Sequence, residues 1–413
     1  MTESAGPSWW REASPAAKRA LIAAGAGWML DAMDVMLYAF ALIAIKSEFG
    51  LTDAQAGGLA SVTLIASAIG GVLSGILADR FGRVRLLMIS ILFYSVFTAL
   101  TATSQTVGQL ILWRILVGLG MGAEWSAGSV LVAEMWPARH RGKAIGLMQS
   151  GWAIGCLLAA LLAGVVLPNA GWRWFFVIGI APALLVFWIR RNLPEPPAWA
   201  QRPAAERSIG AALPVLARTP YLKRALIATA TATALLFAYW GLFTWVPTYL
   251  AASPDRGGAG LGIVKSSWWV VPMQIGAFFG YTSFGFLADR LGRRPTFIAF
   301  VLGAAVVVPI FGLSARSENV LLALGPLVGF FGHGYFSVFG AMLAELFPSS
   351  VRGAAQGMCY NLGRAAAAAA PWVIGGIADR MGIGSALSFT AILYVVGAGL
   401  VLLLPETRGR EIE

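Results

Sequence analysis

Gly75-Ile-Leu-Ala-Asp79-Arg80-Phe-Gly82-Arg83 decides how this chain of 413 residues folds, because it recurs as Gly285-Phe-Leu-Ala-Asp289-Arg290-Leu-Gly292-Arg293. The two copies begin 210 residues apart. In each copy an apolar run of helical length ends in an acid, a base and a glycine flanked by arginine, and a new apolar run follows. Each copy is therefore expected to be a tight polar turn between two membrane-crossing helices.

Two further motifs repeat at almost the same offset. Glu134-Met-Trp-Pro137 matches Glu345-Leu-Phe-Pro348, and Leu193-Pro194-Glu195 matches Leu404-Pro405-Glu406, each pair 211 residues apart. Three matches in one order, at a period of half the chain, predict two homologous halves.

The composition is that of a membrane protein. Hydrophobic residues make up 58% of the chain, charged residues 12%, and the mean hydropathy is +0.75, which is too apolar for a soluble globular protein. The N-terminal segment lacks the pattern of a cleavable signal peptide. The two cysteines lie in apolar runs and indicate neither a disulfide framework nor a metal site, so no cofactor is predicted.

The predicted fold is an all-α membrane protein with twelve transmembrane helices in two pseudo-symmetric six-helix bundles. Only helices and closed β-barrels satisfy all backbone hydrogen bonds in hydrocarbon, and the sequence shows no alternating barrel pattern. The expected spans lie at about 20–42, 55–78, 84–103, 107–133, 142–167, 172–190, 223–250, 266–288, 295–314, 319–346, 354–378 and 384–404. The predicted parts are an N-terminal cytoplasmic segment 1–19, a first bundle 20–190, a cytoplasmic linker 191–222, a second bundle 223–404 and a cytoplasmic tail 405–413.

The basic residues fix the expected orientation. Under this span count 22 of the 30 lysines and arginines fall on the side of both termini and 6 on the other. The positive-inside rule therefore predicts a multi-pass protein of the cell membrane with both termini cytoplasmic. The net charge of +11 does not indicate a nucleic-acid partner, since the bases lie in alternate loops rather than on one face.

Charged and titratable groups inside the spans are the candidate functional residues, since each charge costs about 2.5–3.5 kcal/mol at the bilayer centre. They are Asp31, Asp34, Arg114, Glu124, His333 and Arg364.

Asp31 and Asp34 are expected to form the proton-coupling site. Three residues apart, they share one helix face, and the rise per residue puts Arg114 at the depth of Asp34. When two acids lie beside one base, ionisation of both is unfavourable, so one acid should take up a proton. That acid is expected to carry the coupling proton, with Arg114 as its switchable partner. The alternative is a static ion-pair network. Glu124 is either a proton relay or a structural hydrogen-bonding group.

Arg364 is the expected substrate anchor, because it lies near the midplane beside small alanine side chains and an unpaired guanidinium binds a carboxylate well. Its alternative role is a salt bridge to Glu124 or to the acids of the first span. Trp125 and Tyr360 are expected in the cavity wall. His333, between two glycines, is interpreted as a hydrogen-bonding packing residue.

Over essentially its whole length the chain resembles transporters of the major facilitator superfamily. The repeated loop resembles the signature of that superfamily, and Arg114-x-x-x-Gly118-x-Gly120-x-Gly122 resembles its fourth-span motif. Gly27-Trp28-x-x-Asp31-x-x-Asp34 and Asn361-x-Gly363-Arg364 resemble the sialate and aromatic-acid proton symporter branches, and the latter makes Asn361 a substrate-site candidate. The glycine-proline pair of drug antiporters is missing from Gly151-Trp-Ala-Ile-Gly155, which weakens an efflux function.

The resemblance implies that the repeated loops act as cytoplasmic gates, whose ion pairs close when the site faces outward. The alternative is that these charges determine topology alone. The residues concerned are Asp79, Arg80, Arg83, Glu134, Arg141, Asp289, Arg290, Arg293, Glu345 and Arg352.

The predicted function is secondary active transport: proton-coupled uptake of a small organic anion such as a sialate, monocarboxylate or aromatic acid. The expected partners are this anion, protons and the lipid bilayer, and the expected state is a monomer. The alternatives are symport of a sugar or neutral solute, and a transport-dead membrane sensor. An enzyme is not expected, because two histidines in different settings supply no catalytic cluster.

Overall fold

The computed structural model describes residues 9–137, 140–195, 221–347 and 352–406, which form twelve membrane crossings as predicted. The first four crossings are α2 (Pro15–Phe49), α3 (Asp53–Phe81), α4 (Arg83–Thr101) and α5 (Val107–Met135). α6 (Arg141–Ile178) turns at a kink at Gly171, so its first part is the fifth crossing, and its last part forms the sixth together with α7 (Ala183–Asn192). The other six are α10 (Tyr221–Phe243) with α11 (Val246–Ala251), α12 (Gly262–Leu291), α13 (Arg293–Leu313), α14 (Glu318–Gly334) with α15 (Phe336–Glu345), α16 (Arg352–Ala367) with α17 (Ala370–Met381), and α18 (Ile383–Leu402). By length and composition alone, seven helical stretches in the described chain are long and apolar enough to cross a membrane.

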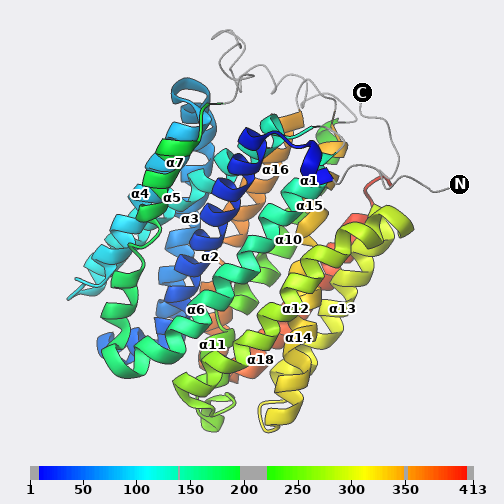
Figure 1. Cartoon of the computed structure of the whole chain (residues 1–413). Coiled ribbons are helices and arrows are strands. Elements are labelled where there is room, and N and C mark those ends of the chain that lie inside the picture. Colours follow the sequence, from blue (N-terminus) through cyan, green and yellow to red (C-terminus); the bar gives the residue numbers. More distant parts are fainter. Residues whose placement is uncertain (1–8, 138–139, 196–220, 348–351, 407–413) are drawn as a thin grey trace, which may run out of the picture.

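The helices stand side by side, and their ends form two faces (Figure 1). The short helix α1 (Trp9–Glu12) and helix α7 lie at one end of the bundle, and α11 lies at the opposite end. We call the latter the α11 end; it includes Asp53, Arg256 and Asp379. Most of the predicted linker, residues 196–220, lies outside the described residues.

The two repeated loops fold into the tight turns that the sequence predicts. α3 ends at Phe81 and α4 begins at Arg83, while α12 ends at Leu291 and α13 begins at Arg293. The single residue between each pair is Gly82 or Gly292, with φ of 105° and 108°. Only glycine adopts such a conformation without strain, so it is required at both positions.

Several crossings of the second half are broken in the middle rather than continuous. α10 stops at Phe243 and α11 resumes with Pro247 in its first turn, and α16 stops at Ala367 before α17, which has Pro371 in its first turn. Proline removes a backbone donor and clashes with the preceding turn, so it begins a new helix segment. The freed backbone groups need buried partners in a membrane.

Glycines on α5 set its close contact with α3. A Cβ atom at Gly118 would collide with the Thr63 carbonyl oxygen, and one at Gly122 with the Ser67 carbonyl oxygen. The fourth-span motif therefore brings the two helix backbones together, as small residues do in membranes. This contact fixes the helix that carries Arg114 and Glu124.

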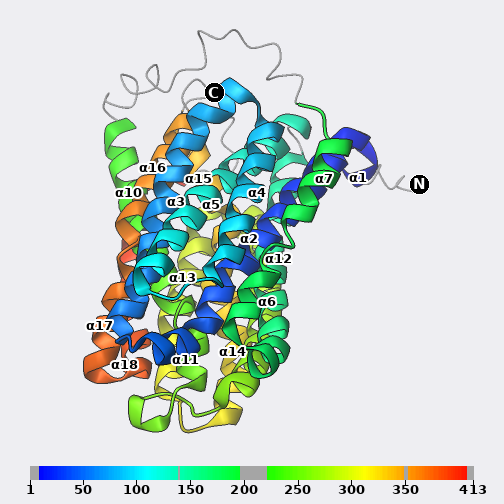
Figure 2. The same ribbon diagram turned by 90° about the vertical axis from the view of Figure 1, so that its left-hand side faces the viewer.

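The two bundles meet along α3 and α17 and along α6 and α12 (Figure 2). Gly57 of α3 packs against the Pro371 carbonyl, and the Ser61 hydroxyl accepts a hydrogen bond of 3.2 Å from the Trp372 amide. Deeper in the molecule, the Trp152 indole donates to the Tyr239 hydroxyl at 2.5 Å. These contacts enclose the space in which the candidate site lies.

Candidate functional site

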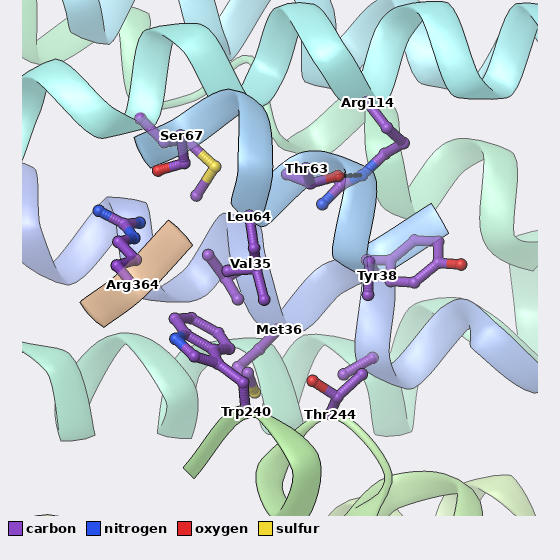
Figure 3. A pocket seen from close by; sticks show the side chains of 13 residues that line it. Val35, Met36, Tyr38, Thr63, Leu64, Ser67, Arg114, Trp240, Thr244 and Arg364 are labelled. Carbon is purple, nitrogen blue, oxygen red and sulfur yellow. Dashed lines mark hydrogen bonds between the residues drawn. The ribbon is translucent and has the colours of Figure 1, made fainter. Parts of the chain in front are cut away.

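A small cavity lies between the bundles, and both predicted arginines line it (Figure 3). It encloses about 30 Å³, room for about one water molecule. Its wall is made by α2, α3 and α5 of the first half and by α10, the break that follows α10, and α16 of the second. It consists of Val35, Met36, Tyr38, Ala39, Ala60, Thr63, Leu64, Ser67, Arg114, Met121, Trp240, Thr244 and Arg364.

Arg114 is buried and held in one orientation. Its Nε donates to the Thr63 hydroxyl at 3.0 Å, and its guanidinium lies over the Tyr38 ring, 4.8 Å from the centroid. Tyr38 is in turn fixed by its hydroxyl, which donates to the Ala56 carbonyl at 2.7 Å. The Nη1 of Arg114 has no hydrogen-bond partner within the described chain, so it remains available to an acceptor.

Arg364 enters the cavity from α16, on the opposite side from Arg114, with Val35 and Leu64 between them (Figure 3). It is 7% exposed, and among the described residues no hydrogen bond or ion pair joins its guanidinium to another side chain. Its charge acts on Asp31. The indole Nε1 of Trp240, which also lines the cavity, has no partner in the described residues either. Both side chains thus line the same space, and the Trp240 donor is unsatisfied there.

Three buried carboxyl groups lie behind this wall. Asp34 accepts a hydrogen bond from the Thr98 hydroxyl at 2.7 Å, and its other oxygen has no partner in the described chain. Asp31 interacts electrostatically with Asp34 and with Glu124, which packs against Gly27 of α2. The three acids therefore form one cluster rather than three independent sites.

The predicted pairing of Asp34 with Arg114 stays a prediction. The two charges act on each other, but in the described chain no ion pair within 4.0 Å joins them, and each binds a threonine hydroxyl instead. Neither Thr63 nor Thr98 can be recognised from the sequence, because a threonine in an apolar run is common and nothing local marks its partner.

The other predicted cavity residues are near the site to different extents. Asn361 is buried, donates to the Gly357 carbonyl at 3.0 Å and packs its oxygen against Gly71 of α3. Tyr360 is partly buried, and the positive charge of Arg364 acts on its hydroxyl group. The side chain of Trp125 lies outside the described part of the structure.

His333 is buried among aromatic rings. Its Nδ1 donates to the Gly329 carbonyl at 3.1 Å, and the rings of Tyr239 and Phe243 lie 5.2 and 4.1 Å away. This geometry agrees with the interpretation as a hydrogen-bonding packing residue.

Most of the predicted gate side chains lie outside the described part of the structure, namely those of Asp79, Arg80, Arg83, Glu134, Arg141, Asp289, Glu345 and Arg352. Arg290 is described and exposed, and Arg293 is partly buried at the start of α13. The gating role of these loops therefore stays a prediction.

The repeated Leu-Pro-Glu motif has a function that sequence reasoning missed. The Glu195 carboxylate accepts hydrogen bonds from the amides of Val84 and Arg85, at 3.1 and 3.0 Å. Glu406 does the same for Arg293 and Arg294, both at 3.0 Å. Each glutamate thus caps the helix that follows a repeated turn, where the orphan amides and the helix dipole favour an anion. The matched repeat was the signal that could have revealed this.

Sequence reasoning also missed a polar connection between the bundles at the α11 end. The Asp379 carboxylate of α17 accepts hydrogen bonds of 2.9 Å from the amides of Asp53 and Ala54 at the start of α3. Asp53 in turn forms ion pairs with Lys46 and with Arg256, the latter at 3.2 Å. We call these four charged residues the α11-end clasp.

A cavity lined by buried charges, between two homologous helical bundles, is the arrangement expected of a membrane carrier. A model of the Major Facilitator Superfamily matches residues 25–281 and 259–412. The chain belongs to this superfamily, so it is a multi-pass membrane transporter and not an enzyme.

Similar proteins support the same assignment. A probable 4-methylmuconolactone transporter of Cupriavidus pinatubonensis is 36% identical over 411 residues, covering 98% of this chain and 94% of the relative. The sialic acid transporter NanX of Escherichia coli is 30% identical over 399 residues, covering 96% of each chain. The crystal structure of a D-xylose-proton symporter superposes with a TM-score of 0.76 at 20% identity, over 95% of this chain and 99% of that one, which confirms the fold. The predicted resemblance to the sialate and aromatic-acid branches is confirmed.

Proposed function

We propose that this protein is a symporter that takes up a small organic anion, a carboxylate, together with a proton. The observation that carries the proposal is the Arg364 guanidinium, buried in the cavity wall without a hydrogen bond or ion pair to any described side chain. A buried cation is costly unless it is paired, and a carboxylate offers two oxygens in the geometry that guanidinium prefers. Relatives named as transporters of a muconolactone and of sialic acid support this substrate class.

The balance of buried charge supports coupling to a proton. Three carboxyl groups share the region with two guanidinium groups, so full ionisation leaves one negative charge in excess. An entering carboxylate adds another. A proton on one acid offsets this charge, so proton and anion favour each other's binding, and this mutual effect is reciprocal by thermodynamic necessity.

We infer that Asp31 carries the coupling proton. Among the three acids its carboxylate is the one on which the Arg364 charge acts most, whereas Asp34 interacts mainly with Arg114. A proton on Asp31 removes the negative charge that competes for Arg364, so the guanidinium becomes free for the substrate. Release of that proton returns Arg364 to Asp31 and expels the anion.

The orientation belongs to the same proposal. The excess of basic residues on the side of the termini supports cytoplasmic termini in the cell membrane, which makes the α11 end the outer face. The two bundles would then rock about the central cavity as a monomer.

The test is uptake by proteoliposomes under an imposed inward pH gradient, with labelled sialic acid, benzoate, lactate and xylose. We expect uptake of an anion that follows the gradient and is lost in Arg364→Gln. The matched control is Arg380→Gln, which removes an exposed arginine from the same crossing and should leave uptake intact. Asp31→Asn should bind the anion without proton-driven accumulation. Xylose uptake indifferent to Arg364→Gln would instead establish a neutral-solute symporter.

A further inference from the structure

A second, larger hollow opens between the bundles at the α11 end. Its volume is about 390 Å³, within the range of small-molecule sites and far above that of the central cavity. Both bundles contribute to its wall, which is formed by Ile43, Lys46, Ser47, Leu51, Asp53, Thr248, Ala251, Ala252, Ser253, Arg256 and Ile383. We call it the outer pocket.

Two cations in this pocket share a single carboxylate. Lys46 and Arg256 both form ion pairs with Asp53. The other acid of the clasp, Asp379, acts on Lys46 through its charge, but both of its oxygens accept hydrogen bonds from backbone amides at the start of α3, and no ion pair within 4.0 Å joins it to either cation in the described chain. Lys46 is only 8% exposed and Arg256 is 58% exposed, so one cation is fixed in the wall while the other reaches solvent. A second carboxylate would find two donors here.

A buried hydroxyl points to a ligand in the same pocket. Thr248 lines it, is 4% exposed, and its Oγ1 has no hydrogen-bond partner in the described chain. An unsatisfied buried hydroxyl costs about 1–3 kcal/mol. The apolar part of the wall, which includes Ile43, Leu51 and Ile383, is suited to the hydrocarbon part of a small acid.

We propose that the outer pocket is a second binding site, which takes the carboxylate of a small organic anion between Lys46 and Arg256, with Thr248 as a hydrogen-bonding partner. That this anion is also the transported one rests on the proposed function. An anion bound here competes with Asp53 for both cations. Because Asp53 begins α3 and is bound to Asp379 of α17, this competition loosens the clasp that joins the bundles. The site therefore receives the anion at the outer face and favours opening towards it.

The test measures protection of a cysteine placed in the pocket. Ser253→Cys places the thiol at an exposed position that lines the pocket, whereas Ser317→Cys places it at an exposed position that is not part of the lining. The native cysteines, Cys156 and Cys359, are buried. Purified full-length protein in lipid nanodiscs is labelled with N-ethylmaleimide, and adducts are counted by intact mass spectrometry. The probes are benzoate, an aromatic carboxylate, and benzamide, its neutral counterpart.

We expect saturating benzoate to slow labelling of Ser253→Cys about tenfold and benzamide to have no effect, with Ser317→Cys unchanged by either. Arg256→Gln should abolish the protection. Thr248→Val, which leaves the ion pairs in place, should raise the half-protecting benzoate concentration several-fold. Protection should persist in Arg364→Gln, which removes the central anchor.

Other results separate the two proposals. If Arg364→Gln abolishes protection while Arg256→Gln and Thr248→Val leave it intact, benzoate acts only through the central cavity and the outer site is refuted. Equal protection by benzamide also refutes it, because charge would then play no part. If protection follows Arg256 and Thr248 but proteoliposomes accumulate no anion, the outer site stands and the proposed transport function falls.

Discussion

Loss of the Asp379 carboxylate should open the α11 end of the molecule. Asp379→Asn keeps one acceptor oxygen for the two amides at the start of α3 but removes the charge and one of the two 2.9 Å hydrogen bonds. A hydrogen bond contributes about 0.5–1.5 kcal/mol net, and an anion at a helix N-terminus about 0.3–1 kcal/mol. Because Asp379 is exposed, we expect the substitution to cost the closed state about 1–2 kcal/mol in total. This free energy changes the equilibrium between the closed and the open state by a factor of about 5–30.

The measurement is the labelling rate of Ala60→Cys, a position in the wall of the central cavity, by a membrane-impermeant thiol reagent added outside intact cells. If opening and closing are fast relative to labelling, the rate follows the open population and should rise about 5–30-fold in Asp379→Asn. Glu318→Gln is the matched control. It breaks an exposed ion pair with Lys265 at 2.5 Å on the same face, but both residues belong to the second bundle.

The reasoning would be refuted if Asp379→Asn left the labelling rate unchanged, or if Glu318→Gln raised it equally. The first result would mean that apolar packing of α3 on α17, through Gly57 and Pro371, holds the outer face closed without the charged residues. The second would mean that any lost surface charge loosens this face.

Three further predictions concern packing and capping, each read as a midpoint of thermal unfolding in the same detergent. Gly122→Ala should lower the midpoint, because the added Cβ collides with the α3 backbone and overpacking costs about 1–3 kcal/mol. The control is Gly376→Ala, which has open space around it and should leave the midpoint unchanged. Equal shifts in the two variants would contradict the packing argument. Glu195→Gln and the equivalent Glu406→Gln should each lower the midpoint, because each removes about 1 kcal/mol of helix capping. An unchanged midpoint in both variants would show that the caps contribute nothing to stability. Trp152→Phe removes a buried donor between the bundles and should destabilise by about 1–3 kcal/mol; an unchanged midpoint would show that the 2.5 Å hydrogen bond contributes little.

The sequence by itself determined the architecture and the positions of the buried charges. Internal repeats and long apolar runs are local or periodic features, so the halves, the twelve crossings and the glycine turns at Gly82 and Gly292 could all be read from the chain. A charge inside an apolar run is equally visible. The structure confirms that Asp31, Asp34, Arg114 and Arg364 are buried, and brings both arginines to one cavity.

Tertiary structure alone decided which groups meet. Asp53 and Asp379 are separated by 326 positions in the chain, and Trp152 and Tyr239 come from different halves, so no spacing rule connects them. The threonines that hold Asp34 and Arg114 are equally invisible, because a hydroxyl in an apolar helix has no signature until its partner is known. Hydrogen bonds act over about 3 Å, whereas the sequence pattern fixes only which face of a helix a residue occupies. The packing of two bundles against each other supplies the rest, and with it the outer pocket.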